Sequence, residues 1–329
     1  MITTPDPALY PVLATIFASL VLGSIARFIR LRNAEPTLRN KRLASLRTWW
    51  MLAAAVSAGL LAGQLGICLL LTAASCIAWF EITRMFEARD QDRLAIRAGY
   101  GLIVGNYLLI LLGSVSLFVV FLPLGSLIIF AVLLLLKGEP KGYIRSAGGL
   151  LWGILFLGYG VSHAALLFIL PGSFTGPLGP AGWFLFLVIL TETDDIFQAI
   201  VGRLFGAHKR HCITPTISPN KTWEGFFGGM LIIVVLAPII APWLTTLSQQ
   251  PGPFSIPEPL QPLIAPILAA ILISFAGFFG DINMSAIKRD SGVKDSSKLL
   301  PGMGGIIDRV DSLSMSAPAF VYFLNWWVA

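Results

Sequence analysis

The chain has 329 residues, of which 56% are hydrophobic and only 12% are charged, and its mean hydropathy is +0.80. Soluble domains carry about 25% charged residues, so this composition excludes a water-soluble globular protein. The net charge of +6 suits anionic lipid headgroups and polyphosphates and requires no nucleic-acid partner. The cysteines, Cys68, Cys76 and Cys212, lack the spacing of metal ligands, which favours small buried side chains over a metal site.

Apolar runs follow one another along the whole chain, and several approach the roughly 20 residues that a membrane-spanning helix needs. They occupy residues 8–29, 49–63, 65–82, 99–113, 115–136, 149–170, 181–199, 226–243, 261–280 and 312–328. The stretches 49–82 and 99–136 each give two spans if the chain turns at glycines near 63–66 and 113, and a single long tilted helix is the alternative. The pattern therefore predicts an all-α, polytopic integral membrane protein with about nine or ten transmembrane helices.

With ten spans, all 23 Lys and Arg residues fall on one side of the membrane. Short cytoplasmic loops carry an excess of basic residues, so we expect this side to be the cytosol and both termini to lie opposite. The first apolar run is followed, not preceded, by basic residues, which indicates a retained helix rather than a signal peptide. We expect a multi-pass protein of the inner (cytoplasmic) membrane, with membrane lipids around it and active loops facing the cytosol.

The two halves of the chain differ in the chemistry of their loops, although no internal repeat separates them. Residues 1–180 are expected to contribute the N-terminal transmembrane helices, whose loops show no recognisable chemistry. Residues 181–329 are expected to contribute the C-terminal transmembrane helices and the catalytic loops, within one membrane domain.

Acids, bases and glycines are concentrated in the segment 280–311. The acids are Asp281, Asp290, Asp295, Asp308 and Asp311, the bases are Lys288, Arg289, Lys294, Lys298 and Arg309, and the turn contains Gly302, Gly304 and Gly305. Carboxylates are hard oxygen ligands suited to Mg²⁺, basic side chains neutralise phosphate oxygens, and glycines let backbone N–H groups approach an anion. A solvated loop is the alternative, but Asp281 lies where a span ends, and an acid at that depth indicates a function. The segment predicts metal-assisted phosphoryl or nucleotidyl transfer.

This segment resembles the signature of the phosphatidate cytidylyltransferases (CDP-diacylglycerol synthases), which reads S-x-x-K-R, then K-D, H-G-G and D-R-x-D. The matching positions are Ser285, Lys288, Arg289, Lys294, Asp295, Gly304, Gly305, Asp308, Arg309 and Asp311. Met303 departs from the pattern, because the family has His there.

A second region is similar to the cytosolic loop of the same family. The run Gly202–Gly206 is followed by Ile217–Gly225, which contains the core Ser-Pro-x-Lys-Thr-x-Glu-Gly. Asp195 has the spacing of the acid that precedes this loop, but the run Asp195–Gln198 looks more like a paralogous bacterial branch.

The resemblance implies that the phosphate of phosphatidic acid attacks CTP and gives CDP-diacylglycerol and pyrophosphate. It implies Mg²⁺ at Asp281, Asp308 and Asp311, while a second cation stays open. The remaining catalytic residues would be Lys288, Arg289, Lys294, Asp295 and Arg309. The substrate-binding residues would be Ser218, Lys221, Asp195, Ser285, Gly302, Gly304 and Gly305.

Several alternatives stay open at this point. The chain could use a different lipid phosphate, such as an isoprenoid ether lipid, or another nucleotide. A transporter and a catalytically inactive paralogue are further readings, and Met303 is the direct support for the last. Association into a homodimer is also left open.

Overall fold

The structure, a computed structural model, describes residues 7–32, 35–86, 89–136, 140–170, 176–206, 211–250, 252–254 and 257–328. The first half of the chain forms α1 (Leu9–Arg30), α2 (Pro36–Leu61), α3 (Gly63–Met85), η1 (Asp90–Asp92), α4 (Arg93–Leu111), α5 (Val115–Leu135), α6 (Tyr143–Gly153), the π-helical η2 (Ile154–Gly160) and α7 (Val161–Leu166). The second half forms α8 (Gly179–Phe205), β1 (Cys212–Thr214), β2 (Ser218–Thr222), α9 (Trp223–Leu244), η5 (Leu247–Gln249), η6 (Glu258–Leu260), α10 (Gln261–Asp290), α11 (Ile307–Val310) and α12 (Leu313–Val328). The predicted all-α, polytopic class is confirmed.

Seven of the described helical segments are long and apolar enough to cross a membrane. They are α1, α3, α4, α5, the continuous segment Tyr143–Leu166, α9, and the segment Glu258–Asp290 that contains α10. Helices α2 and α8 contain several charged residues, and α12 has 16 residues, so these three do not meet the same criterion. Together these ten long segments correspond to the ten apolar runs of the sequence.

The two doubtful stretches are each divided into two helices, as the ten-span prediction requires. Helix α2 ends at Leu61 and α3 begins at Gly63, which has a φ of 66°. Helices α4 and α5 are separated at Gly113, whose φ is 70°. Since side chains with a Cβ rarely adopt these angles, the glycines fix both turns.

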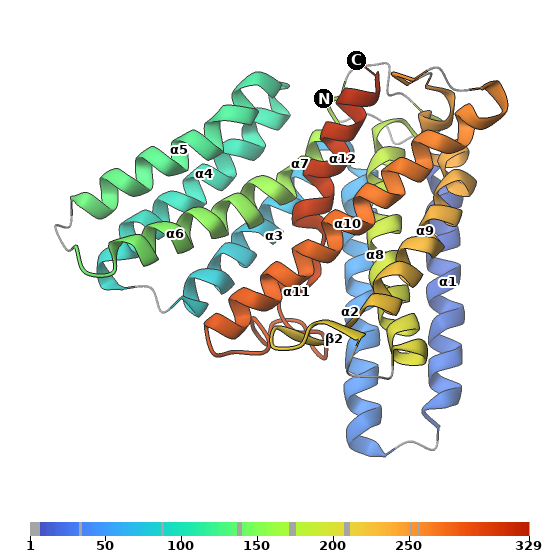
Figure 1. Cartoon of the computed structure of the whole chain (residues 1–329), viewed down its shortest axis with the longest axis horizontal. Helices are drawn as coiled ribbons and strands as arrows, with labels where there is room; N and C mark the ends of the chain where they lie inside the picture. Colours follow the sequence, from blue (N-terminus) through green and yellow to red (C-terminus); the bar gives the residue numbers. More distant parts are fainter. Residues whose placement is uncertain are drawn as a thin grey trace.

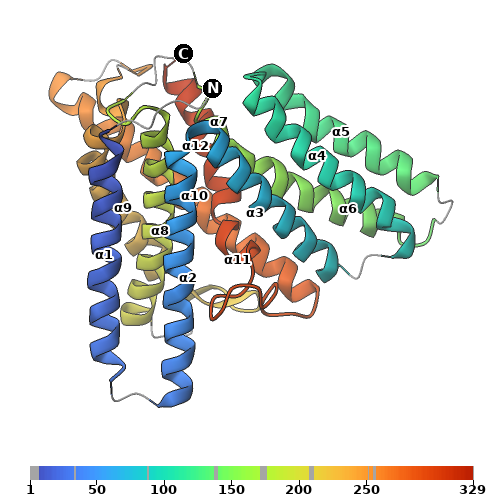
Figure 2. The same cartoon turned by 180° about the vertical axis from the view of Figure 1, so that it is seen from behind.

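Helices α4, α5 and α6 lie on one side of the molecule, and α1, α2, α8 and α9 lie on the other, with α12 and much of α10 between them (Figures 1 and 2). The end of α1, the start of α2, the β1–β2 hairpin and the segment before α11 share one end of the molecule. The start of α1 and the end of α12 lie at the opposite end. This arrangement agrees with the predicted one-sided distribution of the basic residues, while the identity of that side stays a prediction.

The two predicted parts of the chain share one hydrophobic core. One large cluster holds buried side chains from Leu9 to Trp327, a second small cluster holds Phe226, Phe278 and Ile282, and α12 packs against both α7 and α10. Helices α8 and α9 approach closely because α9 begins with glycines: a Cβ on Gly229 would lie 2.5 Å from the side chain of Gln198. Small residues allow such close helix packing in membranes.

The start of α9 also fixes the position of the hairpin. The hydroxyl of Thr222 caps the helix by accepting a hydrogen bond from the N–H of Gly225 at 3.1 Å. Lys221, the preceding residue on β2, is thereby held beside α8 and α10.

Candidate functional site

A cavity of about 590 Å³ lies at the end of the molecule where α8, α10, α11, the start of α12 and the β1–β2 hairpin meet. The predicted site residues that line it are Asp195, Lys221, Asp281, Lys288, Asp295, Asp308, Arg309 and Asp311. Other lining residues include Trp49 of α2, Arg203 of α8 and Met303. The fold thus brings most of the charged residues of both predicted motifs to one place.

Lys221 joins the acids of α8 and α10. Its Nζ atom lies 2.7 Å from Oδ2 of Asp281 and 3.9 Å from Oδ1 of Asp195, and it donates to Oε1 of Gln198 at 3.0 Å. Burial alone would lower the pKa of Lys221, but the two carboxylates raise it above its usual value. Lys221 therefore stays cationic in the cavity wall.

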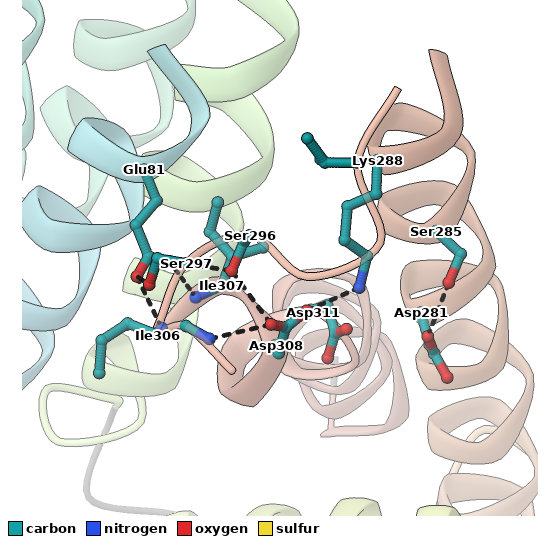
Figure 3. Close-up of polar contacts among 12 residues, drawn as sticks. Glu81, Asp281, Ser285, Lys288, Ser296, Ser297, Ile306, Ile307, Asp308 and Asp311 are labelled. Atoms are coloured by element: carbon teal, nitrogen blue, oxygen red, sulfur yellow. Dashed lines mark hydrogen bonds and ion pairs between the residues drawn. The ribbon is translucent and has the colours of Figure 1, made fainter. Parts of the chain in front are cut away.

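Asp308 is held by one cation and by the loop that precedes it (Figure 3). Its Oδ1 accepts from Lys288 at 2.6 Å, and its Oδ2 accepts from the N–H of Gly305 and the hydroxyl of Ser296, both at 3.0 Å. Burial would raise the pKa of Asp308, but Lys288 and these hydrogen bonds hold it below its usual value. Asp308 is thus an ionised acid of fixed orientation.

Asp311 lies among other carboxylates. Burial raises its pKa above the usual range, and the charges of Asp281 and Asp195 act in the same direction. The Oδ1 atom of Asp311 accepts from the N–H of Ser312 at 2.9 Å, and the hydroxyl of Ser312 donates to Asp195 at 2.7 Å. Carboxyl groups are therefore crowded at this point of the cavity, and this crowding favours the protonated form of Asp311.

These oxygen donors fit a divalent cation by their chemistry, because Mg²⁺ is held mainly by carboxylates and water. Within the described ranges, however, no three His, Cys, Asp or Glu side chains already form a group that could hold a metal ion. Lys221 and Lys288 instead pair with Asp281 and Asp308. A magnesium site at Asp281, Asp308 and Asp311 stays a prediction.

The other predicted residues lie around the cavity without lining it. Ser285 donates to Oδ1 of Asp281 at 3.3 Å and so supports that acid. Arg289 donates to the carbonyl oxygens of Ile217 and Val293, so it connects α10 to the hairpin. Lys294 is exposed, and Ser218 lies on β2, where its carbonyl oxygen accepts from Cys212.

The glycine turn is closed by its own backbone. The N–H of Met303 donates to the carbonyl oxygen of Leu300 at 3.0 Å, and the N–H of Gly305 donates to Asp308. Gly302 and Gly304 have φ angles of 74° and 85°, which residues other than glycine rarely adopt. Two of the N–H groups that we expected to face an anion are thus already used, while direct phosphate contact by Gly302, Gly304 or Gly305 stays a prediction.

Glu81 of α3 belongs to the site, although the sequence analysis did not identify it. Its side chain reaches the segment before α11 and accepts hydrogen bonds from the N–H groups of Ile306 and Ile307 at 3.1 and 2.9 Å (Figure 3). Only 3% of Glu81 is exposed. The available signal was an acid inside the apolar run 65–82, where an ionisable residue is costly.

The cytidylyltransferase family matches residues 43–327 of this chain. The uncharacterized protein YnbB of Escherichia coli strain K12 is 38% identical over 320 residues, which cover 95% of this chain and 97% of YnbB. Phosphatidate cytidylyltransferase of Chlamydia pneumoniae is 31% identical over 261 residues, which cover 75% of this chain and 79% of that protein. The enzyme of the same name from Haemophilus influenzae strain Rd is 37% identical over 139 residues, 42% of this chain and 44% of that protein.

Proposed function

This chain belongs to the cytidylyltransferase family and is a membrane-embedded nucleotidyltransferase, and we propose that it joins CTP to phosphatidic acid, giving CDP-diacylglycerol and pyrophosphate. The observation that carries this proposal is the composition of the cavity. Cationic, anionic and apolar side chains line it together. The apolar residues include Val188, Ile196, Ile200 and Leu313.

A lining that combines charged and apolar side chains suits a substrate with a phosphate head and a hydrocarbon tail. The apolar side chains can contact acyl chains, while the cations attract the phosphate groups of lipid and nucleotide. Names of relatives support the same substrates, since two of those compared above are called phosphatidate cytidylyltransferases. A transporter is less well supported, because transporters place their polar groups near the midplane of the membrane, whereas these charges gather at one end of the molecule.

The proposed reaction requires no general base. A phosphate monoester has a second pKa of roughly 6, so the lipid phosphate is largely ionised at neutral pH. One of its oxygens forms a bond to the α-phosphorus of CTP. The bond from that phosphorus to the oxygen shared with the β-phosphorus breaks, and its electron pair leaves with pyrophosphate.

The protein's contribution is to bring two anions together and to neutralise charge as the leaving group departs. We assign this role to Lys221, Lys288 and Arg309, which line the cavity. Asp195 and Asp281 keep Lys221 in place, and Asp308 does the same for Lys288. Asp295 also lines the cavity and stays in the proposed catalytic set.

Mg²⁺ is proposed as the cofactor, held by Asp281 and Asp311 with Asp308. When bound, such an ion would neutralise charge on the phosphates of CTP. The concentration of acids around Asp311 supports this assignment, because it offers hard oxygen ligands beside a site for polyphosphate. A second cation stays an alternative.

We further propose that the protein lies in the inner membrane with the cavity open to the cytosol. The ends of α1 and α8 and the hairpin, which carry many of the basic residues, share the end of the molecule where the cavity lies. CTP is a cytosolic metabolite, so this orientation would give the site access to its nucleotide.

The experiment that tests the function is direct. The purified protein is incubated with labelled CTP, Mg²⁺ and either phosphatidic acid or an isoprenoid ether lipid phosphate, with Asp281→Asn as the matched inactive control. We expect labelled CDP-diacylglycerol from the wild type. Product from the ether lipid alone would replace phosphatidic acid as the substrate, and no product from any lipid phosphate would support an inactive paralogue.

A further inference from the structure

The carboxylate of Glu81 holds the segment that enters α11 at four points. Its Oε1 accepts from the N–H of Ile306 at 3.1 Å and from the hydroxyl of Ser297 at 2.5 Å. Its Oε2 accepts from the N–H of Ile307 at 2.9 Å and from the hydroxyl of Ser296 at 3.3 Å. These contacts join α3, from the half of the chain with no expected chemistry, to the charged loop (Figure 3).

Because Glu81 is buried, its carboxylate needs hydrogen-bond partners from the protein in place of water. A buried ionised carboxylate is very unfavourable unless hydrogen bonds replace its water. The two N–H groups and the hydroxyl of Ser297 supply most of that replacement, while the single proton of the Ser296 hydroxyl is shared with Asp308. The backbone N–H groups at the start of a helical turn lack partners inside the turn. The carboxylate and the loop therefore satisfy each other only when the loop has this conformation.

Glu81 and Asp308 bind adjacent groups of the same loop. Asp308 accepts from the N–H of Gly305, and Glu81 accepts from the N–H groups of the next two residues. The hydroxyl of Ser296 lies between the two carboxylates, 3.3 Å from Oε2 of Glu81 and 3.0 Å from Oδ2 of Asp308. A change in the position of Glu81 is thus transmitted directly to Asp308.

Gly305 reflects the same close approach. A Cβ at this position would lie 2.4 Å from Oε2 of Glu81 and 2.1 Å from the hydroxyl oxygen of Ser296. Real Cβ atoms do not approach other atoms so closely, so Gly305 is needed in order to admit the carboxylate. This gives the second glycine of the Gly304–Gly305 pair a role in loop geometry that is separate from phosphate binding.

We propose that Glu81 is a positioning residue for the transfer reaction. It fixes the loop so that Asp308 and Arg309 face the cavity and Asp308 stays within reach of Lys288. The inference rests on the proposed function, because an effect of Glu81 on turnover requires that the chain be an active transferase. An effect of Glu81 on the conformation of the loop does not require activity.

The test compares Glu81→Gln with Ser75→Ala. Glutamine keeps the size of the side chain but presents an NH₂ group to donors. Ser75 is the matched control, because it is also buried on α3 and hydrogen-bonded, but its partners, Tyr107 and Leu157, lie outside the loop that Glu81 contacts. We expect kcat to fall about 100-fold in Glu81→Gln, as a misplacement of about 1 Å can cause, with the KM for CTP changed less than about threefold.

Hydrogen exchange of the peptide that covers residues 296–311 gives a readout that does not depend on activity. Exchange should become faster in Glu81→Gln and stay unchanged in Ser75→Ala. A kcat within about twofold of wild type in Glu81→Gln overturns the proposal. A fall in kcat with unchanged exchange also overturns it, because the loop would then not be the route.

A second variant guards against failure of Glu81→Gln to fold. Ser297→Ala removes one of the four donors and leaves the carboxylate in place, so kcat should fall only a few fold with KM unchanged. A wild-type kcat in Ser297→Ala, together with wild-type exchange, counts against the proposal. If the wild type forms no CDP-lipid at all, the proposed function fails, and hydrogen exchange alone decides whether Glu81 fixes the loop.

Discussion

The Nζ atom of Lys288 lies 2.6 Å from Oδ1 of Asp308, and this pair joins the end of α10 to the start of α11. Both side chains are 11% exposed and both line the cavity. Burial would raise the pKa of Asp308, and Lys288 reverses that effect. The ion pair therefore controls both the geometry of the loop and the charge of the acid.

Removing Lys288 should make the stability of the protein less dependent on pH in the acid range. The pKa of Asp308 in the folded protein is below its ordinary value of 3.8, so the ionised acid contributes stability above that pH, and the contribution is lost as the pH falls through the lower folded value. In Lys288→Met, burial is no longer opposed by the cation, so the folded pKa of Asp308 rises toward or above its unfolded value, and the stability lost on acidification becomes smaller.

The measurement is the thermal unfolding midpoint in detergent and EDTA between about pH 3 and 7. We expect Lys288→Met to lose about 3 kcal/mol of stability at neutral pH, because an unpaired charge stays buried. Lys298→Met serves as the control, since Lys298 is exposed. If the unfolding midpoint changed with pH in the same way in Lys288→Met and in the wild type, the pair would not set the protonation of Asp308.

Asp281→Asn should abolish turnover while leaving the fold intact. Asp281 lines the cavity near the end of α10, and it orients Lys221 at 2.7 Å. Loss of its charge removes a proposed metal ligand and the nearest partner of a catalytic cation, so we expect product formation to fall about 100-fold or more.

Asp290→Asn is the matched control, because Asp290 is exposed at the end of the same helix and does not line this cavity. The measurement is CDP-lipid formation over a titration of Mg²⁺, with the unfolding midpoint of each variant as a check on folding. Activity of Asp281→Asn close to that of wild type at every Mg²⁺ concentration would rule out the metal assignment.

The sequence was sufficient for the helices and for much of the cavity. Hydropathy located the spans because a backbone in lipid must satisfy its own hydrogen bonds, which leaves helices as the solution for apolar segments of this kind. Motif spacing located Asp308, Arg309 and Asp311 because these residues lie within one short turn and the start of the next helix. Asp195 was found because its motif lies shortly before the end of α8, and Lys221 was found because its motif lies in the hairpin that follows α8.

The remaining features depend on contacts between distant segments, which spacing does not reveal. Glu81 and Ile306 are 225 positions apart, and their contact exists because α3 packs close to α11. The glycine turn was expected to offer backbone N–H groups to phosphate, but the N–H of Met303 donates to Leu300 and that of Gly305 donates to Asp308. Only a structure of the loop shows that its own carbonyl and carboxylate groups compete with phosphate for these N–H groups.

Labelling from the two sides of the membrane should confirm the proposed orientation. Lys298 and Glu258 are exposed and lie in segments that the ten-span prediction puts on opposite sides. Ser255, in the same segment as Glu258, lies outside the described residues. In a background without Cys68, Cys76 and Cys212, we expect Glu258→Cys to react with an impermeant thiol reagent in intact cells, and Lys298→Cys to react only after the membrane is opened. Labelling of both from the same side would contradict the topology.

Met303→His restores the residue that the resembled signature has at this position. Met303 lines the cavity, and its own N–H is used by Leu300, so the side chain is its means of contacting a substrate. Since Lys221, Lys288 and Arg309 supply the positive charge, the wild type should already be active. An imidazole would add at most one hydrogen bond to a charged group, which is worth about 1.5–3 kcal/mol.

We therefore expect Met303→His to raise turnover or the affinity for CTP by up to some tens of fold, and we expect it not to create activity where none exists. Met303→Leu is the control, because it keeps an apolar side chain of similar size and should match the wild type. The measurement is CDP-lipid formation by the three proteins side by side, with kcat and KM for CTP determined separately. An increase through KM alone would indicate that the imidazole contacts the nucleotide in the ground state, because a contact made equally in ground and transition states leaves kcat unchanged. Product from Met303→His alone would instead show that the wild-type chain is inactive and that the methionine is the reason.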